Sequence, residues 1–538
     1  MKQNESKIGL ISEVARKRFG IDMVKPFQML VMERILEQDD GAFVRHQLVI
    51  LPTGTGKSLC FLVPAVLCKG LTIIVYPLLA LMNDQMSKLA GADIECIALR
   101  GGQTKVQRAE LWKKIDGGAK IIVTTPETLL RDDVLKRLAR HRISLLVVDE
   151  AHVIAQWGMD FRPQYSQLGK AVAELMPKQV LGFTATASKD TVDFISKHLF
   201  PSRPLVVRGN ADRENIVYSV YRCLDRTQAV MDILDGCMKP AIVFCRTRHD
   251  AHQLCYEILR HIALAGNKSK TDGEGYAHAF AVRYYHAGLS RSEREALERW
   301  FAHTTDGVLV TTCAFGMGVD VKSIRTVIHY DLPKTVEEYL QESGRAGRDG
   351  MTSMAWVVQD IGENAAKAES GTLASVFEGG DCRRRGLLRA LGEDQLECTG
   401  CDVCLGSRMP IAREEPVIRS FAGLFAFRFS LEEAAYMLTG NPDSSAVDDA
   451  GRSNPFFGAL SDWNCTSLKG ALRRLCRSGS IGIGCVRFCR RGQLIHRTDI
   501  PLHRLVASIL GGIDAVYLWI SGAMGKMTWK RRRGSHSS

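Results

Sequence analysis

Short apolar runs that end abruptly in polar or small residues recur through the first two thirds of the chain. Leu48 to Leu51, Ile121 to Val123 and Val147-Val148 are runs of this kind. Strands that are apolar on both faces are typical of a parallel sheet covered by helices on its two sides. In such sheets, functional residues gather at the carboxyl ends of the strands, which is where the polar residues of this chain stand.

The apolar pattern starts again near residue 209, so we predict two consecutive α/β domains, in residues 1–208 and 209–358. In the second domain, strands are expected within Pro240 to Arg248 and within Ile324 to Pro333, the latter as the last strand. A helical cysteine module is assigned to residues 359–410. A further small domain is assigned to residues 411–510, and a basic tail to residues 511–538.

The small domain has the pattern of a winged helix. Leu468, Leu472 and Leu475 lie on one side of a predicted amphipathic helix, which is followed by a strand and a hairpin turning near Gly492. Cys485 and Cys489 are interpreted as ordinary thiols. The arginines of this domain are candidate contacts to a nucleic-acid backbone, namely Arg473, Arg474, Arg487, Arg490 and Arg491.

The composition favours a cytoplasmic protein with a polyanionic partner. The 538 residues include 71 Lys and Arg against 59 Asp and Glu, a formal net charge of +12. The N-terminal residues lack the apolar core of a signal peptide, and the 16 cysteines therefore indicate metal binding or free thiols. The apolar stretch Leu505 to Gly525 is not interpreted as a membrane anchor, because it contains Asp514 and several glycines.

Residues 52–58 read PTGTGKS and directly follow an apolar run. In such a loop, backbone N–H groups cradle phosphates, the lysine reaches the β- and γ-phosphates, and the serine hydroxyl binds Mg²⁺. Upstream, Gln28 beside Lys25 could read the adenine edge, because its amide offers one donor and one acceptor. The predicted nucleotide-binding residues are Lys25, Gln28, Thr53, Gly54, Thr55, Gly56, Lys57 and Ser58.

Asp149 and Glu150 end another apolar run. A strand-end Asp can hold Mg²⁺, and a neighbouring Glu can orient an attacking water. Thr184 and Thr186, in the segment GFTATA, are expected to hydrogen-bond to this pair. A mixed aromatic and charged segment that follows the pair suits a loop that stacks on bases, although an ordinary packed loop is the alternative; it contains Gln156, Trp157, Asp160, Phe161 and Arg162.

Arg345 and Arg348 stand three residues apart in QESGRAGRDG, and we predict that they share one face of a helix. Aimed across a domain cleft, they would act as arginine fingers on the γ-phosphate, contacts that are worth roughly 10³ to 10⁵ in rate. The alternative is a solvated basic helix face.

Cys382 is followed by Cys398, Cys401 and Cys404, which have the spacing C-x2-C-x2-C. Four thiolates of this kind predict a tetrahedral structural Zn²⁺ site without a catalytic role. Arg383, Arg384 and Arg385 are interpreted either as phosphate contacts or as a solvated helix face.

Taken together, these motifs resemble the RecQ family of DNA helicases. The resemblance is close over roughly residues 15–410 and looser over 411–510. The motor motifs are shared across the second helicase superfamily, whereas an aromatic-rich loop joined to a cysteine module resembles RecQ in particular. The matching segments are Phe27-Gln28, PTGTGKS, DEAHVIAQWGMDFRPQY, GFTATA, YYHAGLS, TTCAFGMGVD, QESGRAGRDG and CRRR…CTGCDVC.

The resemblance implies two tandem RecA-like domains and an ATP- and Mg²⁺-dependent 3′-to-5′ DNA helicase that acts in repair and recombination at a bacterial nucleoid. It implies single-stranded and duplex DNA as partners, single-strand-binding or recombination proteins as candidate partners, and no membrane. By position it assigns catalysis to Lys57, Asp149, Glu150, Arg345 and Arg348, Mg²⁺ to Ser58 and Asp149, DNA sensing to Gln156, Trp157, Phe161 and Arg162, and Zn²⁺ to Cys382, Cys398, Cys401 and Cys404.

Three residues depart from the family pattern. Lys25 stands where Arg is usual, and Ile21 where an aromatic ring usually stacks on adenine, so we expect looser nucleotide selectivity. Met159 replaces a frequent His, so looser coupling of DNA binding to ATP hydrolysis is expected. Few residues follow the winged-helix segment, and we expect weaker targeting to branched DNA.

Two other functions fit part of the pattern. An RNA helicase or remodeller would use the same motor core, and a DNA-docking protein would bind without productive turnover. The cysteine module and the aromatic loop favour the DNA helicase.

Overall fold

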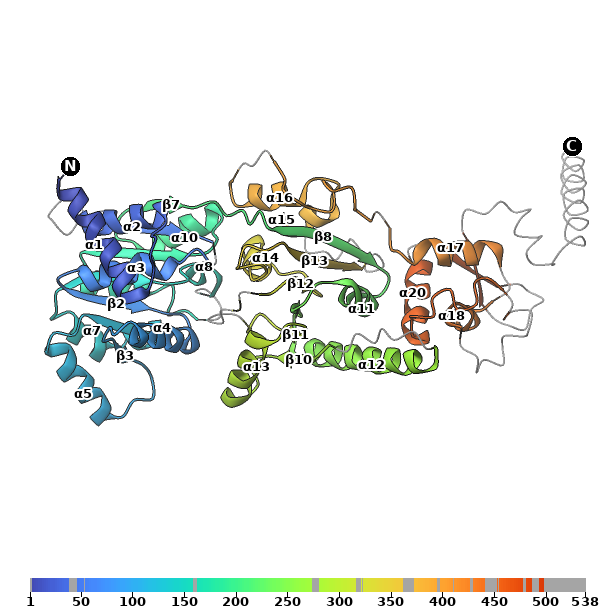
Figure 1. Ribbon diagram of the computed structural model, residues 1–538, viewed down its shortest axis with the longest axis horizontal. Helices are drawn as coiled ribbons and strands as arrows, with labels where there is room; N and C mark the ends of the chain where they lie inside the picture. Colours follow the sequence, from blue (N-terminus) through green and yellow to red (C-terminus); the bar gives the residue numbers. More distant parts are fainter. Residues whose placement is uncertain are drawn as a thin grey trace, which may run out of the picture.

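The computed structural model describes residues 2–37, 46–52, 54–157, 162–272, 280–315, 321, 323–360, 372–393, 397–409, 411–425, 429–440, 452, 454–477, 480–485 and 493–497. Two α/β domains and a smaller C-terminal unit lie in a row along the longest axis of the molecule (Figure 1). No helix among the described residues is long and apolar enough to cross a membrane.

The first domain is built on a seven-stranded sheet with the order β3-β4-β2-β5-β6-β1-β7. Every described strand pairing in it is parallel. The order places β6 between β1 and β5, so the segments that follow these three strands lie together. The strands are β1 (Gln47–Ile50), β2 (Leu71–Val75), β3 (Ile97–Leu99), β4 (Ile121–Thr124), β5 (Ile143–Val148), β6 (Gln179–Thr184) and β7 (Leu205–Arg208).

Helices cover both faces of this sheet. Leu48 and Ile50 of β1 contribute to one hydrophobic cluster, and Val49 and Leu51 to another, because successive side chains of a strand point to opposite faces. The helices are α1 (Lys2–Phe19), α2 (Pro26–Glu37), α3 (Lys57–Leu67), α4 (Leu79–Gly91), α5 (Lys105–Asp116), α6 (Pro126–Leu129), α7 (Asp132–Leu138), α8 (Val153–Trp157), α9 (Leu168–Leu175) and α10 (Lys189–Leu199).

The second domain has a six-stranded sheet with the order β10-β11-β9-β12-β13-β8, again with parallel pairings. The two parallel sheets confirm the predicted α/β architecture. The elements are β8 (Ile216–Cys223), β9 (Ala241–Phe244), β10 (Val282–Tyr285), β11 (Val308–Thr311), β12 (Thr326–His329), β13 (Ser353–Asp360), α11 (Arg226–Gly236), α12 (Arg248–Asp272), α13 (Arg291–His303) and α14 (Val336–Ser343).

The prediction that the strand within Ile324 to Pro333 is the last of this sheet was wrong. That strand is β12, and β13 follows it and pairs with both β12 and β8. The burial of β13 alternates in part, and its residues include Ser353 and Gln359, so the run is less uniformly apolar than the other strands. A partly polar strand gives a weaker periodic signal than a fully buried one.

Two smaller units complete the chain. The cysteine module, here the described part of residues 372–409, contains α15 (Thr372–Glu378) and α16 (Arg383–Ala390) and lies beside β8 (Figure 1). The described part of the C-terminal unit contains α17, α18 and α20 and an antiparallel strand pair, the helix-then-hairpin order that a winged helix requires. Its elements are α17 (Glu415–Leu424), α18 (Leu431–Thr439), α20 (Cys465–Arg477), β14 (Ile481–Cys485) and β15 (Gln493–Arg497).

The predicted amphipathic helix is α20, and its three leucines are buried in the core of the C-terminal unit. The predicted turn near Gly492, the side chains of Cys485 and Cys489, the stretch Leu505 to Gly525 and the basic tail lie outside the described residues.

Glu414 precedes α17 and is 3% exposed. Burial, and then the negative charge of Asp232, raises the pKa of Glu414 to about 7, although Arg413 opposes this shift. The folded C-terminal unit therefore binds a proton here that the unfolded chain releases at lower pH. Its stability is complete below the ordinary glutamate pKa and falls as the pH rises through about 7.

We predict that Glu414→Gln removes this loss, because the amide stays neutral at every pH. Between pH 5 and pH 8 the melting temperature of the variant should rise relative to that of the wild type. The corresponding difference in the free energy of unfolding is about a few kcal/mol at most. Thermal unfolding at four pH values measures the difference, with Glu415→Gln as the control for loss of a neighbouring carboxylate. Parallel profiles of the wild type and Glu414→Gln would contradict the assignment.

Candidate functional site

The phosphate loop follows β1 and leads into α3. Gly54 and Gly56 have φ of 80° and 83°, a left-handed backbone that favours glycine, and Gly56 caps α3 without a side-chain hydrogen bond. The Thr55 hydroxyl donates back to the Pro52 carbonyl over 2.6 Å. The N–H groups at the start of α3, from Lys57 on, are therefore directed to a position in which phosphate oxygens would accept hydrogen bonds from them. Thr53 lies outside the described residues.

Gln28, on α2, forms hydrogen bonds that fix the position of this loop. Its buried amide Nε2 donates to the Thr55 carbonyl over 2.9 Å, and its Oε1 accepts from the Lys25 backbone N–H over 2.9 Å. A Cβ atom on Gly56 would lie 2.6 Å from Gln28 Nε2, so the close approach depends on glycine. Recognition of adenine by Gln28 stays a prediction, and the Lys25 side chain is exposed nearby.

The acidic pair stands at the carboxyl end of β5, beside the phosphate loop. Asp149 is buried, and its Oδ1 accepts the backbone N–H of Glu150 over 3.0 Å. Glu150 has φ of 49°, an uncommon conformation for a residue with a side chain and one that often marks a functional site. Lys57 Nζ lies 3.5 Å from Glu150 Oε1, so the two motifs meet directly.

His152 is a site residue that the motif analysis missed. Its Nδ1 lies 3.0 Å from Thr184 Oγ1 and 3.4 Å from Glu150 Oε2. Because the Thr184 hydroxyl also donates to the Thr186 carbonyl, Nδ1 of His152 is the protonated nitrogen. The expectation that Thr184 and Thr186 bond directly to the acidic pair was wrong, because Thr184 bonds to His152 instead. The position of His152 two residues after Glu150 was the available signal.

The charges of this cluster act on one another. Burial, and then the charge of Glu150, raises the pKa of Asp149 to about 7. Burial also opposes ionisation of Glu150, but the charge of Lys57 more than offsets it, so the pKa of Glu150 lies below its ordinary value. Burial lowers the pKa of His152 and keeps its ring neutral. Glu150 is therefore the more acidic member of the pair.

These residues fit a bound nucleotide with Mg²⁺. Within the described part of the chain, neither Lys57 Nζ nor Glu150 Oε2 has a hydrogen-bond partner, although both are buried. A phosphate oxygen and a water molecule are the partners that these two atoms lack. The half-buried Ser58 hydroxyl and the Asp149 carboxylate are oxygen donors of the type that Mg²⁺ binds.

Arg345 and Arg348 do not lie on a helix, which corrects the prediction. Helix α14 ends at Ser343, and a turn continues through residue 349. Gly347 in this turn has φ of 56°, which an α-helix does not allow. A Cβ atom on Gly54 would lie 3.8 Å from Arg348 Cγ, so the turn of the second domain contacts the phosphate loop of the first.

Arg345 is 6% exposed and lies within the electrostatic reach of Glu150. Burial, and then the like charge of Arg348, lowers the pKa of Arg345 to about 10, whereas Glu342 and Glu150 oppose the shift. Arg345 remains cationic at neutral pH. The structure thus brings Arg345 near Glu150 and Arg348 near the phosphate loop.

A second contact joins the two domains. Glu337 Oε1, on α14, accepts the Ser188 N–H over 3.0 Å and the Thr191 hydroxyl over 3.2 Å. Ser188 is the N-cap residue of α10, so a carboxylate of the second domain meets a helix N-terminus of the first. The segment after Thr184 therefore reaches the domain interface.

The predicted DNA-sensing segment is described only at its ends. Gln156 is half-buried on α8, whereas the Trp157 side chain and residues Met159 and Phe161 lie outside the described residues, as does Asp160. Arg162 Nη1 and the Tyr165 hydroxyl both donate to the Pro77 carbonyl over 2.9 Å. Because Pro77 follows β2, the far end of the segment is tied to another strand end.

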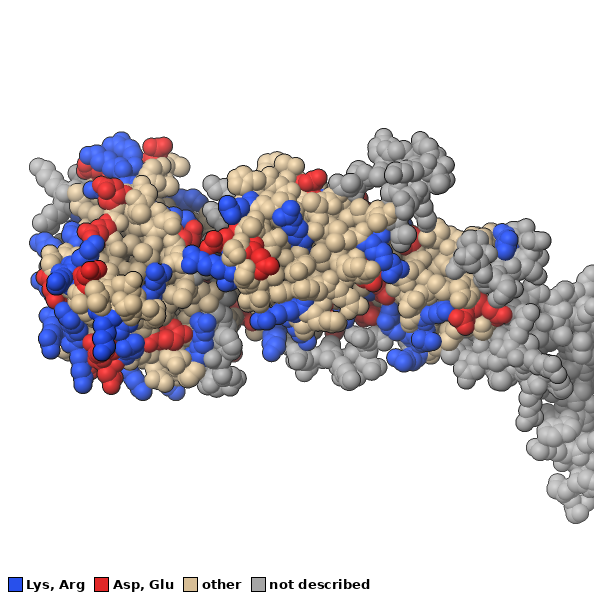
Figure 2. All heavy atoms as spheres, turned by 90° about the horizontal axis from the view of Figure 1, so that it is seen from below, with Lys and Arg blue, Asp and Glu red and all other residues tan. Residues whose placement is uncertain are grey.

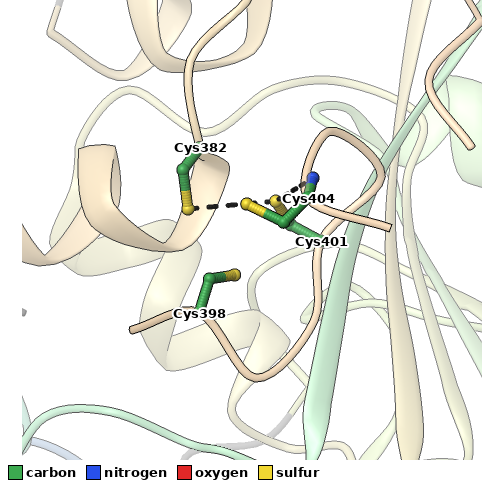
Figure 3. Close-up of side chains that lie close together, drawn as sticks. All are labelled: Cys382, Cys398, Cys401 and Cys404. Atoms are coloured by element: carbon green, nitrogen blue, oxygen red, sulfur yellow. Dashed lines mark hydrogen bonds between the residues drawn. The ribbon is translucent and has the colours of Figure 1, made fainter. Parts of the chain in front are cut away.

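The four predicted cysteine ligands come together (Figure 3). Their sulfur atoms all lie within 4.8 Å of one another, and Sγ of Cys382 and Sγ of Cys401 are 3.9 Å apart. A tetrahedron with Zn–S bonds of about 2.3 Å has edges of about 3.8 Å. Cys382 caps the N-terminus of α16, and Cys401 pairs with Tyr218 of β8, so the group of thiols fits one metal ion.

Arg383 and Arg384 are neither phosphate contacts nor a solvated face, which corrects both interpretations. Their side chains are 0% and 1% exposed. Arg383 Nε donates to Asp402 Oδ1 over 3.1 Å, and Arg384 forms an ion pair with Asp212. Buried charges require such partners, so these two arginines hold the cysteine module together. Arg385 is exposed.

Arg474 is also not available to contact a nucleic-acid backbone, because its side chain is already paired. It lies in ion pairs with Asp225 and Asp360 of the second domain, at 3.6 Å and 3.7 Å. Arg473 is exposed on α20, whereas Arg487, Arg490 and Arg491 lie outside the described residues. The pattern of α20 could not distinguish Arg473 from its neighbour, because both stand on the polar side of the helix.

The chain is similar to known helicases. Residues 25–194 match the family model described as DEAD/DEAH box helicase, and residues 225–350 match the one described as Helicase conserved C-terminal domain. The solved structure of DEAD-box helicase Mss116 bound to ssRNA and UDP-BeF has a TM-score of 0.51 and 19% identity, covering 72% of this chain and 81% of that one. That likeness is one of fold.

Two curated relatives are more similar in sequence. ATP-dependent DNA helicase RecQ of Pasteurella multocida (strain Pm70) is 33% identical over 413 residues, 73% of this chain and 62% of the relative. This chain therefore spans less than two thirds of that protein. ATP-dependent DNA helicase RecQ of Bacillus subtilis (strain 168) is 30% identical over 434 residues, 76% of this chain and 71% of the relative. With that coverage, and with the motor and cysteine motifs in place, the chain belongs to the RecQ family.

Proposed function

We propose that this chain is an ATP-hydrolysing DNA helicase that moves 3′ to 5′ on single-stranded DNA and unwinds duplexes in repair and recombination. The observation that carries the proposal is the approach of the Arg345–Arg348 turn of the second domain to the phosphate loop of the first, where a Cβ atom on Gly54 would lie 3.8 Å from Arg348 Cγ. Arg345 in the same turn lies within electrostatic reach of Glu150. A site completed by both domains couples the state of the nucleotide to the distance between them.

Each residue of the site has a distinct role in the proposed reaction. The N–H groups at the start of α3 and Lys57 bind the phosphates. Ser58 and Asp149 would hold Mg²⁺, which would supply positive charge beside the phosphates. The ionised Glu150 orients the attacking water. Arg345 and Arg348 stabilise the charge that develops on the γ-phosphate.

Closure and opening follow from this arrangement. Bound ATP supplies the anionic group that draws the arginines of the second domain toward the phosphate loop. Hydrolysis and release of phosphate remove that attraction, and the domains separate. Strand-end loops of both sheets then hold the DNA backbone in turn, with the segment from Gln156 to Arg162 reporting contact to the acidic pair.

DNA is the proposed substrate, with single-strand-binding and recombination proteins as proposed partners. On the face shown in Figure 2, Lys and Arg gather most densely over the first domain, interleaved with Asp and Glu. Several cations of the first domain already have partners, such as Arg137 with Asp116 and Arg108 with Asp133. The net charge of +12 thus favours a polyanion without defining a single track.

We also propose Zn²⁺ for the cysteine cluster and the domain limits 1–208, 209–358, 359–410, 411–510 and 511–538. The short sulfur–sulfur separations support zinc, and the end of β7 at Arg208, before β8 begins, supports the first limit. The helix-then-hairpin order supports a winged helix in the fourth segment.

Strand displacement tests the proposed function. Two duplexes are compared, one with a 3′ single-stranded tail and one with a 5′ tail. We expect ATP-dependent unwinding of the 3′-tailed duplex alone, and none with Lys57→Ala. Unwinding of the 5′-tailed duplex instead would contradict the polarity, and equal stimulation of ATP hydrolysis by RNA and by single-stranded DNA would favour an RNA-directed motor.

Arg348→Ala should lower kcat for ATP hydrolysis by about 10³-fold or more with little change in KM, because the contact matters mainly in the transition state. Steady-state hydrolysis at saturating single-stranded DNA measures both constants. An unchanged kcat would remove Arg348 from the site.

Cys401→Ser should give poorly soluble protein, because a structural zinc site contributes on the order of 10 kcal/mol to folding. Metal content by atomic absorption should be about one Zn²⁺ per chain in the wild type. Cys68→Ser, at a buried cysteine remote from the cluster, is the control and should keep its zinc. Normal yield and melting temperature of Cys401→Ser would refute a structural role for the site.

A further inference from the structure

The turn that contains Arg345 and Arg348 follows the end of α14 and is not part of a helix. Three of its carbonyl groups accept hydrogen bonds from the Arg213 side chain. Arg213 Nη1 donates to the Gly344 carbonyl over 3.0 Å, and Nη2 donates to those of Ala346 and Gly347 over 3.1 Å and 2.9 Å. The guanidinium fork thus replaces the hydrogen bonds that a continued helix would have made.

Asn215 makes a second set of contacts to the same turn. Its Nδ2 donates to the Gly347 and Met351 carbonyls, each over 2.9 Å. A Cβ atom on Gly347 would overlap Asn215 Nδ2, so this approach depends on glycine at a residue whose φ is already positive. Both ends of the turn are therefore fixed by residues 213 and 215.

These two residues belong to the segment that joins the two domains, between β7 and β8. The cysteine module fixes this segment from its other side. Arg384 pairs with Asp212 and donates through Nη1 to the Arg213 carbonyl over 3.0 Å. The Thr399 hydroxyl donates to the Glu214 carbonyl over 3.0 Å, and Glu393 Oε2 accepts the Ala211 N–H over 3.2 Å.

We propose that Arg213 and Asn215 are positioning residues that hold the Arg345–Arg348 turn in its hydrolytic geometry, and that Arg384 of the cysteine module fixes their backbone. The contacts form an unbroken path from the cysteine module, through the domain-joining segment, to the arginine pair. The proposal rests on the proposed ATPase activity and extends it. The cysteine module then serves catalysis through geometry, without touching the nucleotide.

The planar guanidinium group explains why position 213 is occupied by arginine. A lysine at this position keeps the charge but presents three donors from one nitrogen, and it cannot reach three carbonyls of a turn in one plane. The turn would then shift relative to the γ-phosphate. A displacement of about 1 Å in a catalytic group can cost on the order of 10²-fold in rate.

The experiment compares Arg213→Lys and Asn215→Ala with the wild type and with Arg260→Lys. Arg260 lies on α12 and donates to Glu257 Oε2 over 3.4 Å, so it is a matched arginine outside the turn, the domain-joining segment and the cysteine module. We expect Arg213→Lys to lower kcat by 10- to 100-fold, with KM for ATP within about twofold, and Arg260→Lys to match the wild type. Asn215→Ala should lower kcat in the same manner but less, and it keeps the test decisive if Arg213→Lys fails to fold.

Two further readouts separate positioning from general stability. In a background of Arg348→Ala and Arg345→Ala, Arg213→Lys should cause no additional loss of kcat, since it acts through those arginines. Amide hydrogen exchange should rise within residues 344–351 of Arg213→Lys and not elsewhere in the second sheet. A further multiplicative loss in that background, or unchanged exchange in the turn, would overturn the proposal.

The proposed function and this inference fail in different ways. If the wild type hydrolyses ATP and Arg213→Lys does so equally well, only the inference is wrong. If the wild type shows no DNA-stimulated hydrolysis, the proposed function is wrong, and the exchange experiment still decides whether Arg213 anchors the turn.

Discussion

The nucleotide site depends on one buried anion, Glu150, that lies within reach of cations from two domains. Lys57 approaches it from the phosphate loop of the first domain, and Arg345 influences it from the second. Charges interact strongly when they are shielded from water, so a small change in the separation of the domains changes the energy of the whole cluster. The acidic pair can therefore respond to domain closure without any long side-chain movement.

The parallel sheet makes this cluster possible. Because β6 lies between β1 and β5, the phosphate loop, the acidic pair and Thr184 meet at one edge. His152 lies between the last two, hydrogen-bonded to Thr184 and 3.4 Å from Glu150 Oε2. The second sheet presents its own turn to that edge. The interface contact between Glu337 and the N-terminus of α10 adds a fixed point beside the site.

Arginines in this chain have three different tasks that their local sequence does not distinguish. Arg345 and Arg348 face the nucleotide site, Arg213 binds carbonyls of their turn, and Arg383 and Arg384 are buried within or beneath the cysteine module. A buried guanidinium needs several acceptors at once, and a turn or helix end with exposed carbonyls provides them. For this reason basic runs in such a module are poor indicators of DNA contact.

The sequence by itself determined the two parallel-sheet domains, the phosphate loop, the acidic pair and the four thiol ligands, because each depends on local periodicity or on ligand spacing. It also showed the amphipathic face of α20. Only the tertiary structure decided the partners of Thr184, Arg384 and Arg474, and the end of α14 before Arg345. Those outcomes depend on residues far away in the chain, such as Asp212 and Asp360. A charge on a helix face has the same local pattern whether solvent or a distant carboxylate balances it, so its partner is set only when the domains pack.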